Sequence, residues 1–352
     1  MPSGSGSVIP ASLPLNDSAM PDILGAGEAG CQAAEGDAHT YRRRLRQDLK
    51  LKISNFQFWI CYPCSAMREI RGAVAVVTGA ASGIGRALAV DLAKRGAQLA
   101  LADVNSAGLA ETLGLLGDAV ARTYSVDVSK AAAVEDFAHR VQQDFGRASL
   151  LVNNAGVALM GTLAEVSLED MEWLVQINLW GVVYGCKFFL PMLQREPDAH
   201  IVNVSSIFGL IGPPGQTAYS ASKFAVRGFS ESLREELRAT SAIKVTSVHP
   251  AGIATPIAHN ARAGRGVTTA ARLEAEESFK KVAVITPEEA SRVIVKGILG
   301  DKNRVLIGAD AYRIDRIQRL FPARASSMFA AWLARRRRKD ESTPAARVSK
   351  TV

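Results

Sequence analysis

Short apolar runs alternate with longer helical patterns between Gly72 and position 307, and this alternation constrains the fold more than any other feature. Nearly continuous apolar runs of this length are typical of strands in a parallel sheet that helices cover on both faces. The expected strands span 73–78, 98–102, 121–126, 150–152, 201–204, 244–248 and 304–307. The expected helices span 83–95, about 107–116, 131–145, 168–193, 218–238 and 287–299. The pattern predicts an α/β fold with a doubly wound parallel sheet.

A glycine-rich loop joins the first strand to the first helix, in the stretch Thr78-Gly-Ala-Ala-Ser-Gly-Ile-Gly85. Glycines allow a tight turn and let the backbone approach a pyrophosphate, and the helix N-terminus offers free N–H groups to that anion. Alone, such a loop is also compatible with an ordinary turn. Its place after a strand and before a helix favours a Rossmann dinucleotide site. The loop residues expected to contact the cofactor are Gly79, Ser82, Gly83, Ile84 and Gly85.

Asp103 lies at the end of the second strand, 18 residues after Gly85. A carboxylate at this place accepts hydrogen bonds from the adenosine ribose hydroxyls and repels a 2′-phosphate, which favours NAD over NADP. Neither Val104 nor Ser82 supplies the cation that NADP needs, and the sequence leaves the direction of Arg86 open. The competing interpretation of Asp103 is a cap in the strand–helix loop.

Tyr219 and Lys223 are four residues apart at the start of an expected helix, which places the phenol and the ammonium on one face. A nearby cation favours the phenolate and lowers the pKa of a tyrosine, so Tyr219 is suited to exchange a proton with a substrate hydroxyl. Ser206 lies 13 residues upstream, where its hydroxyl can bond a developing oxyanion; neighbouring Ser205 is the alternative. A Tyr-x3-Lys pair alone is usually a surface helix pair.

Several motifs occur together in the order typical of one family. They are the glycine loop after Thr78, Asp127 after the third strand, Asn153-Asn-Ala-Gly156 after the fourth, Asn178 in the long helix, Ser206, and Tyr219-x3-Lys223. On these motifs, residues 72–257 resemble the short-chain dehydrogenase/reductase family in its compact form. The resemblance implies that Ser206, Tyr219 and Lys223 form a catalytic triad with Asn178 as fourth member. In that family the Asn holds a water that links the Lys to solvent, and the Lys also binds the nicotinamide ribose.

The resemblance also implies further cofactor contacts. Asp127 and Val128 resemble the segment that contacts adenine, and Asn154, Ala155 and Gly156 the one that supports the sheet and lines the cofactor groove. The stretch His249-Pro-Ala-Gly-Ile-Ala-Thr255 resembles the family's carboxamide-binding segment, which implies contacts from Ile253 and Thr255. It departs from the pattern because Ala251 stands where glycine is usual and Gly252 follows one place later.

The net charge of +8 is concentrated in one part of the chain. Residues 1–66 and 67–310 are each neutral, and residues 311–352 carry the whole excess, which disfavours a specific nucleic-acid-binding domain. We therefore expect three regions: an N-terminal extension (1–66) that is disordered or an incorrectly assigned start, one NAD-binding domain (67–310) and a basic tail (311–352). No metal site is expected, because Cys61 and Cys64 have no second cysteine pair and the five histidines are scattered.

The tail leaves two interpretations open. Ile314, Ile317, Leu320 and Phe321 recur at helical spacing with arginines between them, followed by the basic run 335–339. Such a segment suits peripheral contact with an anionic membrane, or a helix packed on the body with a solvated basic end. We expect a cytoplasmic protein. A third use of the tail, in nucleic-acid or membrane binding with the domain as a platform, is disfavoured by the neutral body.

The expected reaction is hydride transfer between NAD(H) and a hydrophobic secondary alcohol or ketone, with Tyr219 as general acid/base. The expected pocket comprises 207–217, 158–162 and the stretch after Thr255, with 257–285 as a lid. The alternatives are an NADP-dependent carbonyl reductase and a non-catalytic NAD(H)-binding scaffold, which the intact set of four site residues argues against. By resemblance, helices 168–193 and 218–238 pair between subunits of a homodimer or homotetramer.

Overall fold

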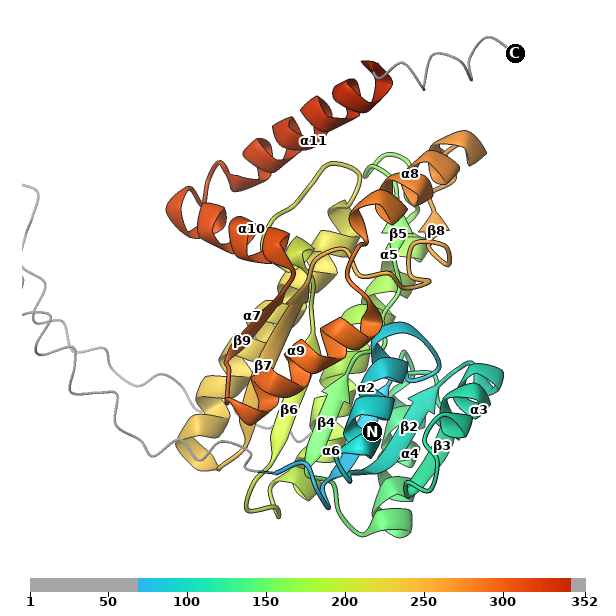
Figure 1. Cartoon of the computed structure of the whole chain (residues 1–352), viewed down its shortest axis with the longest axis vertical. Coiled ribbons are helices and arrows are strands. Elements are labelled where there is room, and N and C mark those ends of the chain that lie inside the picture. Colours follow the sequence, from blue (N-terminus) through green and yellow to red (C-terminus); the bar gives the residue numbers. More distant parts are fainter. Residues whose placement is uncertain (1–68, 343–352) are drawn as a thin grey trace, which may run out of the picture. The chain divides into compact units, whose positions relative to one another are not determined.

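The computed structural model describes the backbone of residues 69–342 and the side chains of residues 69–335 (Figure 1). The expected N-terminal extension, Cys61, Cys64 and the side chains of the basic run beyond Arg335 lie outside these ranges.

Seven parallel strands form the central sheet, in the order β3-β2-β1-β4-β6-β7-β9. The strands are β1 (Val74–Thr78), β2 (Gln98–Asp103), β3 (Ala121–Ser125), β4 (Leu150–Asn153), β6 (His200–Val204), β7 (Lys244–Pro250) and β9 (Arg304–Ile307). The strand order reverses direction between β1 and β4, and ligands of doubly wound sheets bind at such a switch point, outside the carboxyl ends of the strands. The predicted doubly wound parallel α/β fold is confirmed.

Helices cover both faces of this sheet (Figure 1). They are α2 (Gly83–Lys94), α3 (Ser106–Gly114), α4 (Ala131–Phe145), α5 (Leu168–Val175), α6 (Gly181–Leu193), α7 (Thr217–Thr240), α8 (Thr269–Val282), α9 (Pro287–Leu299), α10 (Ala309–Leu320) and α11 (Ala325–Ser342). Alternate residues of β1 face opposite sides, so Ala75 and Val77 join one core cluster while Val76 joins the other.

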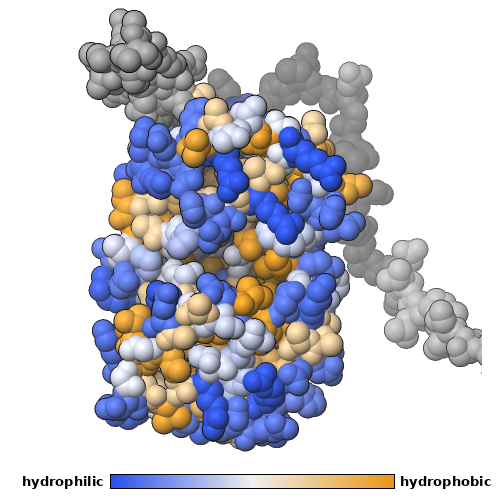
Figure 2. Space-filling view, turned by 90° about the vertical axis from the view of Figure 1, so that its right-hand side faces the viewer, coloured by the Kyte–Doolittle hydropathy of each residue, from blue (hydrophilic) through white to orange (hydrophobic). Residues whose placement is uncertain are grey.

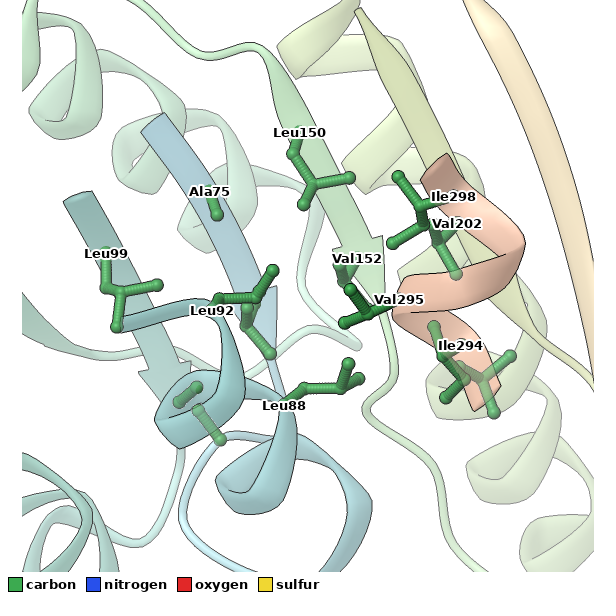
Figure 3. Packing of buried hydrophobic residues seen from close by; sticks show 14 of the residues in the cluster. Ala75, Leu88, Leu92, Leu99, Leu150, Val152, Val202, Ile294, Val295 and Ile298 are labelled. Carbon is green, nitrogen blue, oxygen red and sulfur yellow. The ribbon is translucent and has the colours of Figure 1, made fainter. Parts of the chain in front are cut away.

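The two clusters have different helical covers. In Figure 3, Leu88 and Leu92 of α2 and Val295 of α9 lie beside apolar side chains of the sheet. The opposite cluster takes Phe137 from α4 and Phe189 from α6, which pack with ring centroids 5.2 Å apart. The sheet is therefore buried on both faces, as its apolar strands require.

The long helix expected over 168–193 contains a wider turn. A π-helical segment, Gln176–Trp180, separates α5 from α6 and places Asn178 fully inside the protein. Such π segments occur frequently at functional sites. Within the described residues, this 26-residue stretch is the one helix long and apolar enough to cross a membrane. A buried core helix passes the same test, and α6 contributes Phe189 and Leu193 to the core.

Two segments outside the central sheet lie near its carboxyl edge. Residues 257–285, expected as a lid, include a short strand β8 (Arg262–Ala263), which pairs with β5 (Leu159–Met160), and α8. Farther along, α10 and the start of α11 pack against the segment after β6, where Leu210, Ile211, Ile314 and Ala325 form a buried cluster.

Candidate active site

The glycine loop has a backbone shape that fits a bound pyrophosphate. Gly79 and Gly83 have φ of +68° and +53°, a region that favours glycine. A Cβ on Gly85 would collide with the Gly79 carbonyl oxygen. Ser82 precedes α2 without capping it through its side chain, so the amides of the first turn remain directed to the loop.

Asn154 and Thr78 hold this loop in place. The Asn154 side-chain amide donates to the carbonyl oxygens of Thr78 (3.0 Å) and Gly79 (3.1 Å). In return, the Thr78 hydroxyl accepts from the backbone N–H groups of Asn154 and Ala155, both at 3.1 Å. Thr78 was not predicted as a site residue, although it directly precedes the glycine loop. These bonds tie the ends of β1 and β4 together at the switch point.

Asp103 sits at the end of β2 and caps the neighbouring turns. Its carboxylate accepts from the backbone N–H groups of Ala81 and Asn105, both at 3.0 Å. The capping interpretation therefore describes bonds that exist in the protein, and it leaves the remaining oxygen lone pairs for a ribose. The open direction of Arg86 is resolved, because its guanidinium pairs with Glu111 of α3 at 2.7 Å.

The expected adenine segment follows β3. The Asp127 carboxylate accepts from the backbone N–H (2.9 Å) and the hydroxyl (2.7 Å) of Ser129, which closes a turn. Val128 is buried and lies against Gly181 of α6. The structure thus places Asp127 and Val128 at the carboxyl edge of the sheet with the glycine loop and Asp103.

Asn178 is held firmly by the backbone after β4. Its side-chain oxygen accepts from the Val157 N–H at 2.8 Å, and its amide donates to the Val157 carbonyl (3.0 Å) and the Ser222 hydroxyl (3.2 Å). Gly156 lies between Asn178 and Lys223, because a Cβ there would be 3.2 Å from the Asn178 oxygen and 3.3 Å from the Lys223 Nζ. The structure thus brings Asn178 and Lys223 together at Gly156.

Lys223 and Tyr219 come from the first turns of α7. The Lys223 ammonium donates to the Val204 carbonyl at 3.1 Å and lies 5.8 Å from the centroid of the Tyr219 ring. An ammonium has three donors, and within the described residues this is its one hydrogen-bond partner. Two of its three donors therefore have no hydrogen-bond partner among the described residues.

Ser206, and not Ser205, reaches the tyrosine. The Ser206 side chain hydrogen-bonds Tyr219 and accepts from the Phe208 N–H at 3.1 Å, so it also begins the short helix Ile207–Gly209. The Ser205 hydroxyl instead donates to the Lys223 carbonyl at 2.8 Å and is consumed in fixing α7 to β6.

The pKa values differ from the expectation that Lys223 favours the phenolate. Burial raises the pKa of Tyr219 to about 12, and the hydrogen bond from Ser206 lowers it only in part. Burial also lowers the pKa of Lys223 to about 8. Because the ammonium is directed at Val204, Tyr219 in the protein alone keeps its proton at neutral pH.

The unusual segment after β7 is compatible with the same architecture. A glycine is required at position 252, one place after the family's usual position, because a Cβ there would lie 2.5 Å from the Val282 carbonyl oxygen at the end of α8. Ala251 continues the sheet by donating to the Ile307 carbonyl at 3.0 Å. Ile253 is buried, and Thr255 packs directly against Gly83 of the glycine loop.

His249, the first residue of the stretch that ends at Thr255, was not predicted to support the site. Its Nδ1 lies 2.9 Å from the Ser206 carbonyl oxygen, and because a carbonyl can only accept, Nδ1 carries the proton. Burial lowers the pKa of His249 to about 4, so the ring is neutral at physiological pH. His249 therefore fixes the backbone of Ser206 from the neighbouring strand.

Comparisons with known proteins agree with this geometry. A family model described as short chain dehydrogenase matches residues 73–266. Over 272 residues the chain is 43% identical to a Mycobacterium tuberculosis protein named as an oxidoreductase, SadH, and the match covers 76% of this chain and 98% of that protein. A short-chain dehydrogenase/reductase from Burkholderia phymatum, solved in complex with NAD, has a TM-score of 0.66 at 32% identity, over 71% of this chain and 94% of that one.

A solved alcohol dehydrogenase from the archaeon Thermococcus sibiricus, complexed with 5-hydroxy-NADP, has a TM-score of 0.58 at 25% identity, over 67% of this chain and 96% of that one. The fold and the site define a dinucleotide-binding oxidoreductase. The chain belongs to the short-chain dehydrogenase/reductase family and is an NAD(P)-dependent enzyme. Solved relatives bind NAD in one case and an NADP derivative in another, which supports a nicotinamide cofactor for this chain.

Within residues 69–335 no group of three or more His, Cys, Asp or Glu side chains is placed to hold a metal ion. The polar groups around Tyr219 are instead the hydroxyl of Ser206, the amide of Asn178 and the ammonium of Lys223, which suit proton transfer and hydrogen bonding.

Proposed function

We propose that this protein transfers a hydride between NAD(H) and a hydrophobic secondary alcohol or ketone, with Tyr219 as the general acid/base. One observation carries the proposal: Ser206 bonds the phenol of Tyr219, while Lys223 and Asn178 meet at Gly156 beside it. These groups come from four separate segments that converge at the carboxyl edge of the sheet.

Each residue has a distinct task in this proposal. The nicotinamide, when bound, supplies or accepts the hydride. Tyr219 gives its proton to the carbonyl oxygen in reduction and takes it back in oxidation. Ser206 donates to the substrate oxygen and stabilises its developing charge. The two remaining Lys223 donors bind the nicotinamide ribose and a water held by Asn178, which returns the proton from solvent.

The protonated Tyr219 and charged Lys223 make the protein alone ready for reduction. Because the pKa of Lys223 is about 8, its ammonium is present at neutral pH and is lost as the pH rises through 8. We therefore expect the carbonyl-reduction rate to fall above that pH, and alcohol oxidation to rise with pH as proton release becomes easier.

Asp103 and Arg86 favour NAD as the physiological cofactor. The Asp103 carboxylate repels a 2′-phosphate, and Arg86 is already paired with Glu111. The rival is an NADP-dependent carbonyl reductase. Direct titration with NADH and NADPH separates the two, and Asp103→Ser should weaken NADH binding while it improves NADPH binding. Equal affinities in the wild type would contradict this assignment.

Fewer residues are proposed to contact the substrate than the sequence indicates. Leu210 and Ile211 are buried against Ile314 of α10. Phe208 is partly exposed beside Tyr219, and Met160 of β5 is partly exposed, which favours an apolar substrate. We propose that the partly exposed Ile207 and Phe208, Met160 and the stretch after Thr255 surround it, with 257–285 over the site.

A homodimer or homotetramer is the proposed assembly. Along α6 and the preceding π segment, Trp180 stacks on Tyr184 with centroids 5.6 Å apart, and Tyr184 lies 6.3 Å from Phe188. Trp180 and Phe224 of α7 are both substantially exposed. An apolar face of this kind is suited to an isologous contact. Sedimentation should give a dimer or larger species for the wild type and a smaller one for Trp180→Glu.

Fewer apolar residues of the tail are available for peripheral membrane contact than the sequence indicates. Ile314 is buried and Ile317 is partly buried against the same cluster, so the protein itself covers much of this apolar face. Leu320 and Phe321 remain exposed at the α10–α11 corner. On the face shown in Figure 2, apolar and polar residues are interspersed. We propose that the enzyme is cytoplasmic. Lipid contact is tested by flotation on anionic vesicles, comparing the full chain with a chain that ends at Asp310.

The proposed activity is tested by a panel of secondary alcohols and ketones, monitored through NADH absorbance with NAD and NADP in parallel. Turnover in the wild type that is lost in Tyr219→Phe, with retained NADH binding, supports the mechanism. Binding of NADH without turnover of any alcohol or ketone would favour the non-catalytic scaffold.

A further inference from the structure

Four aromatic rings form a row that begins at Tyr219 and continues onto α11, which we call the aromatic row. Phe208 meets Tyr219 edge-to-face at 6.2 Å between centroids, and Phe329 meets Phe208 edge-to-face at 6.3 Å. Trp332 stacks on Phe329 at 5.6 Å. The row therefore connects the proposed general acid to residues more than one hundred positions later in the sequence.

The start of α11, which carries the last two rings of the row, is held by two contacts. Ser326 of α11 accepts a hydrogen bond from the Gly212 N–H at 3.1 Å, in the segment between Ser206 and Tyr219. Ala325 is buried among Leu210, Ile211 and Ile314. The start of α11 is thus fixed to the segment that precedes the catalytic helix.

An ion-paired cluster anchors α10, which carries α11. Arg304 of β9 bonds Asp315 of α10 at 2.7 Å and Glu231 of α7 at 2.6 Å. Arg319 bonds the second oxygen of Asp315 at 2.7 Å. Asp315 is largely buried, so these contacts are less screened than ion pairs at the open surface. The C-terminal helices are therefore connected to the sheet, α7 and the substrate segment together.

The rings of the aromatic row differ from the core aromatics in exposure. Phe137 and Phe189 are 1% and 0% exposed, as packing residues are. Trp332 is 44% exposed, and Tyr219, Phe208 and Phe329 are all partly exposed. Phe208 and Phe329 also pack against the buried cluster that contains Ile314. Rings that are fixed in this way and still partly accessible are suited to bind a further apolar group.

We propose that the aromatic row is the binding surface for the apolar part of the substrate, so that Phe329 and Trp332 of α11 are specificity-determining residues. This inference rests on the proposed function. The reacting carbon lies at Tyr219, and an acyl chain or fused-ring body extends over Phe208, Phe329 and Trp332. Small alcohols reach only the first ring, so the row discriminates by length of the apolar group and leaves the chemistry at Tyr219 unchanged.

The test compares Phe329→Ala and Trp332→Ala with the wild type on a short and a long-chain secondary alcohol. Met328→Ala is the matched control, because Met328 is equally exposed on the same helix and is not part of the row. For the long-chain alcohol we expect kcat/KM to fall about 10- to 100-fold in each row variant, mainly through KM. The short alcohol, NADH affinity and the control should stay near wild-type values, and Phe329→Tyr should restore most of the loss.

A structural effect alone would change the rates for both alcohols equally and lower the melting temperature, and that result would overturn the inference. So would unchanged long-chain kinetics in both row variants. Calorimetric titration of the NADH-loaded protein with a long-chain methyl ketone makes the test independent of turnover. Weaker ketone binding by both row variants supports the aromatic row as the binding surface, even if no alcohol is oxidised. The absence of alcohol oxidation would separately refute the proposed function. Equal binding by wild type and variants, or no binding by the wild type, contradicts the row.

Discussion

Gly156 separates the two residues that we propose to relay the proton, and adding one methyl group there should stop the relay while leaving the fold intact. In Gly156→Ala the new Cβ would lie 3.2 Å from the Asn178 side-chain oxygen and 3.3 Å from the Lys223 Nζ. Both distances are shorter than an ordinary carbon contact of about 3.5–4.0 Å, so one of the two neighbours must move.

The hydrogen bonds indicate which neighbour yields. Asn178 is fixed by three bonds, to both backbone groups of Val157 and to Ser222. Lys223 has one bond, to Val204, and ends a flexible side chain. We therefore expect the ammonium to shift, at a cost near the lower end of the roughly 1–3 kcal/mol typical of overpacking. Removing a positioned proton relay should lower kcat by about 100-fold or more.

The assay combines alcohol oxidation, NADH binding by fluorescence and thermal unfolding. For a domain of this size a loss of about 1 kcal/mol lowers the melting temperature by roughly 2–4 °C. Gly114→Ala is the control, since a Cβ at Gly114 meets nothing within 4 Å. A Gly156→Ala protein that folds and keeps near wild-type kcat would refute the reasoning about Lys223 and Asn178.

Three further outcomes concern stability. Burial lowers the pKa of His200 and His249 to about 4, below the unfolded value of about 6.5. Each neutral ring therefore contributes up to about 3 kcal/mol of folding stability, which is fully present above about pH 6.5 and is lost as the pH falls through 4. Urea unfolding at several pH values should show this decline, and a flat profile over that window would contradict it. Gly185→Ala should prevent folding or cost several kcal/mol, because its methyl would collide with the buried side-chain oxygen of Asn153; soluble expression and circular dichroism measure it. Arg304→Met should cost about 2 kcal/mol and make α10 susceptible to proteolysis, because two carboxylates lose a charged partner; unchanged proteolysis would show that the apolar cluster alone holds α10.

The sequence predicted the sheet well because its strands are short apolar runs separated by glycines and helical patterns. Their order in space was not predicted, because it depends on the side of the sheet to which each crossover returns. The convergence of Ser206, Tyr219, Lys223 and Asn178 was also predictable, since motifs at the carboxyl ends of parallel strands meet at one edge.

Features that depend on tertiary contacts were not predictable. The π segment at Asn178 has no distinctive local pattern, and the bond that Asn178 accepts from the Val157 N–H joins residues 21 positions apart. The role of His249 depends on the neighbouring strand, where the Ser206 carbonyl happens to face its ring.

The tail shows the same limit. Helical spacing of Ile314 and Ile317 fits a membrane face and a packed face equally, and only the partner surface decides. That partner is the segment around Leu210 and Ile211, which the sequence placed in the substrate pocket. The pKa of Tyr219 is a further case, because the effect of Lys223 depends on the direction of its ammonium, toward Val204.

The most direct test of the central claim is hydride transfer by Tyr219→Phe. This change removes one hydroxyl from a partly exposed ring and leaves the contact with Phe208 in place. We predict that the variant binds NADH with wild-type affinity and unfolds at nearly the same temperature. Its rates of secondary-alcohol oxidation and ketone reduction should be lower by about 100-fold or more. A Tyr219→Phe protein that turns over these substrates at the wild-type rate would contradict the assignment of Tyr219 as the general acid/base.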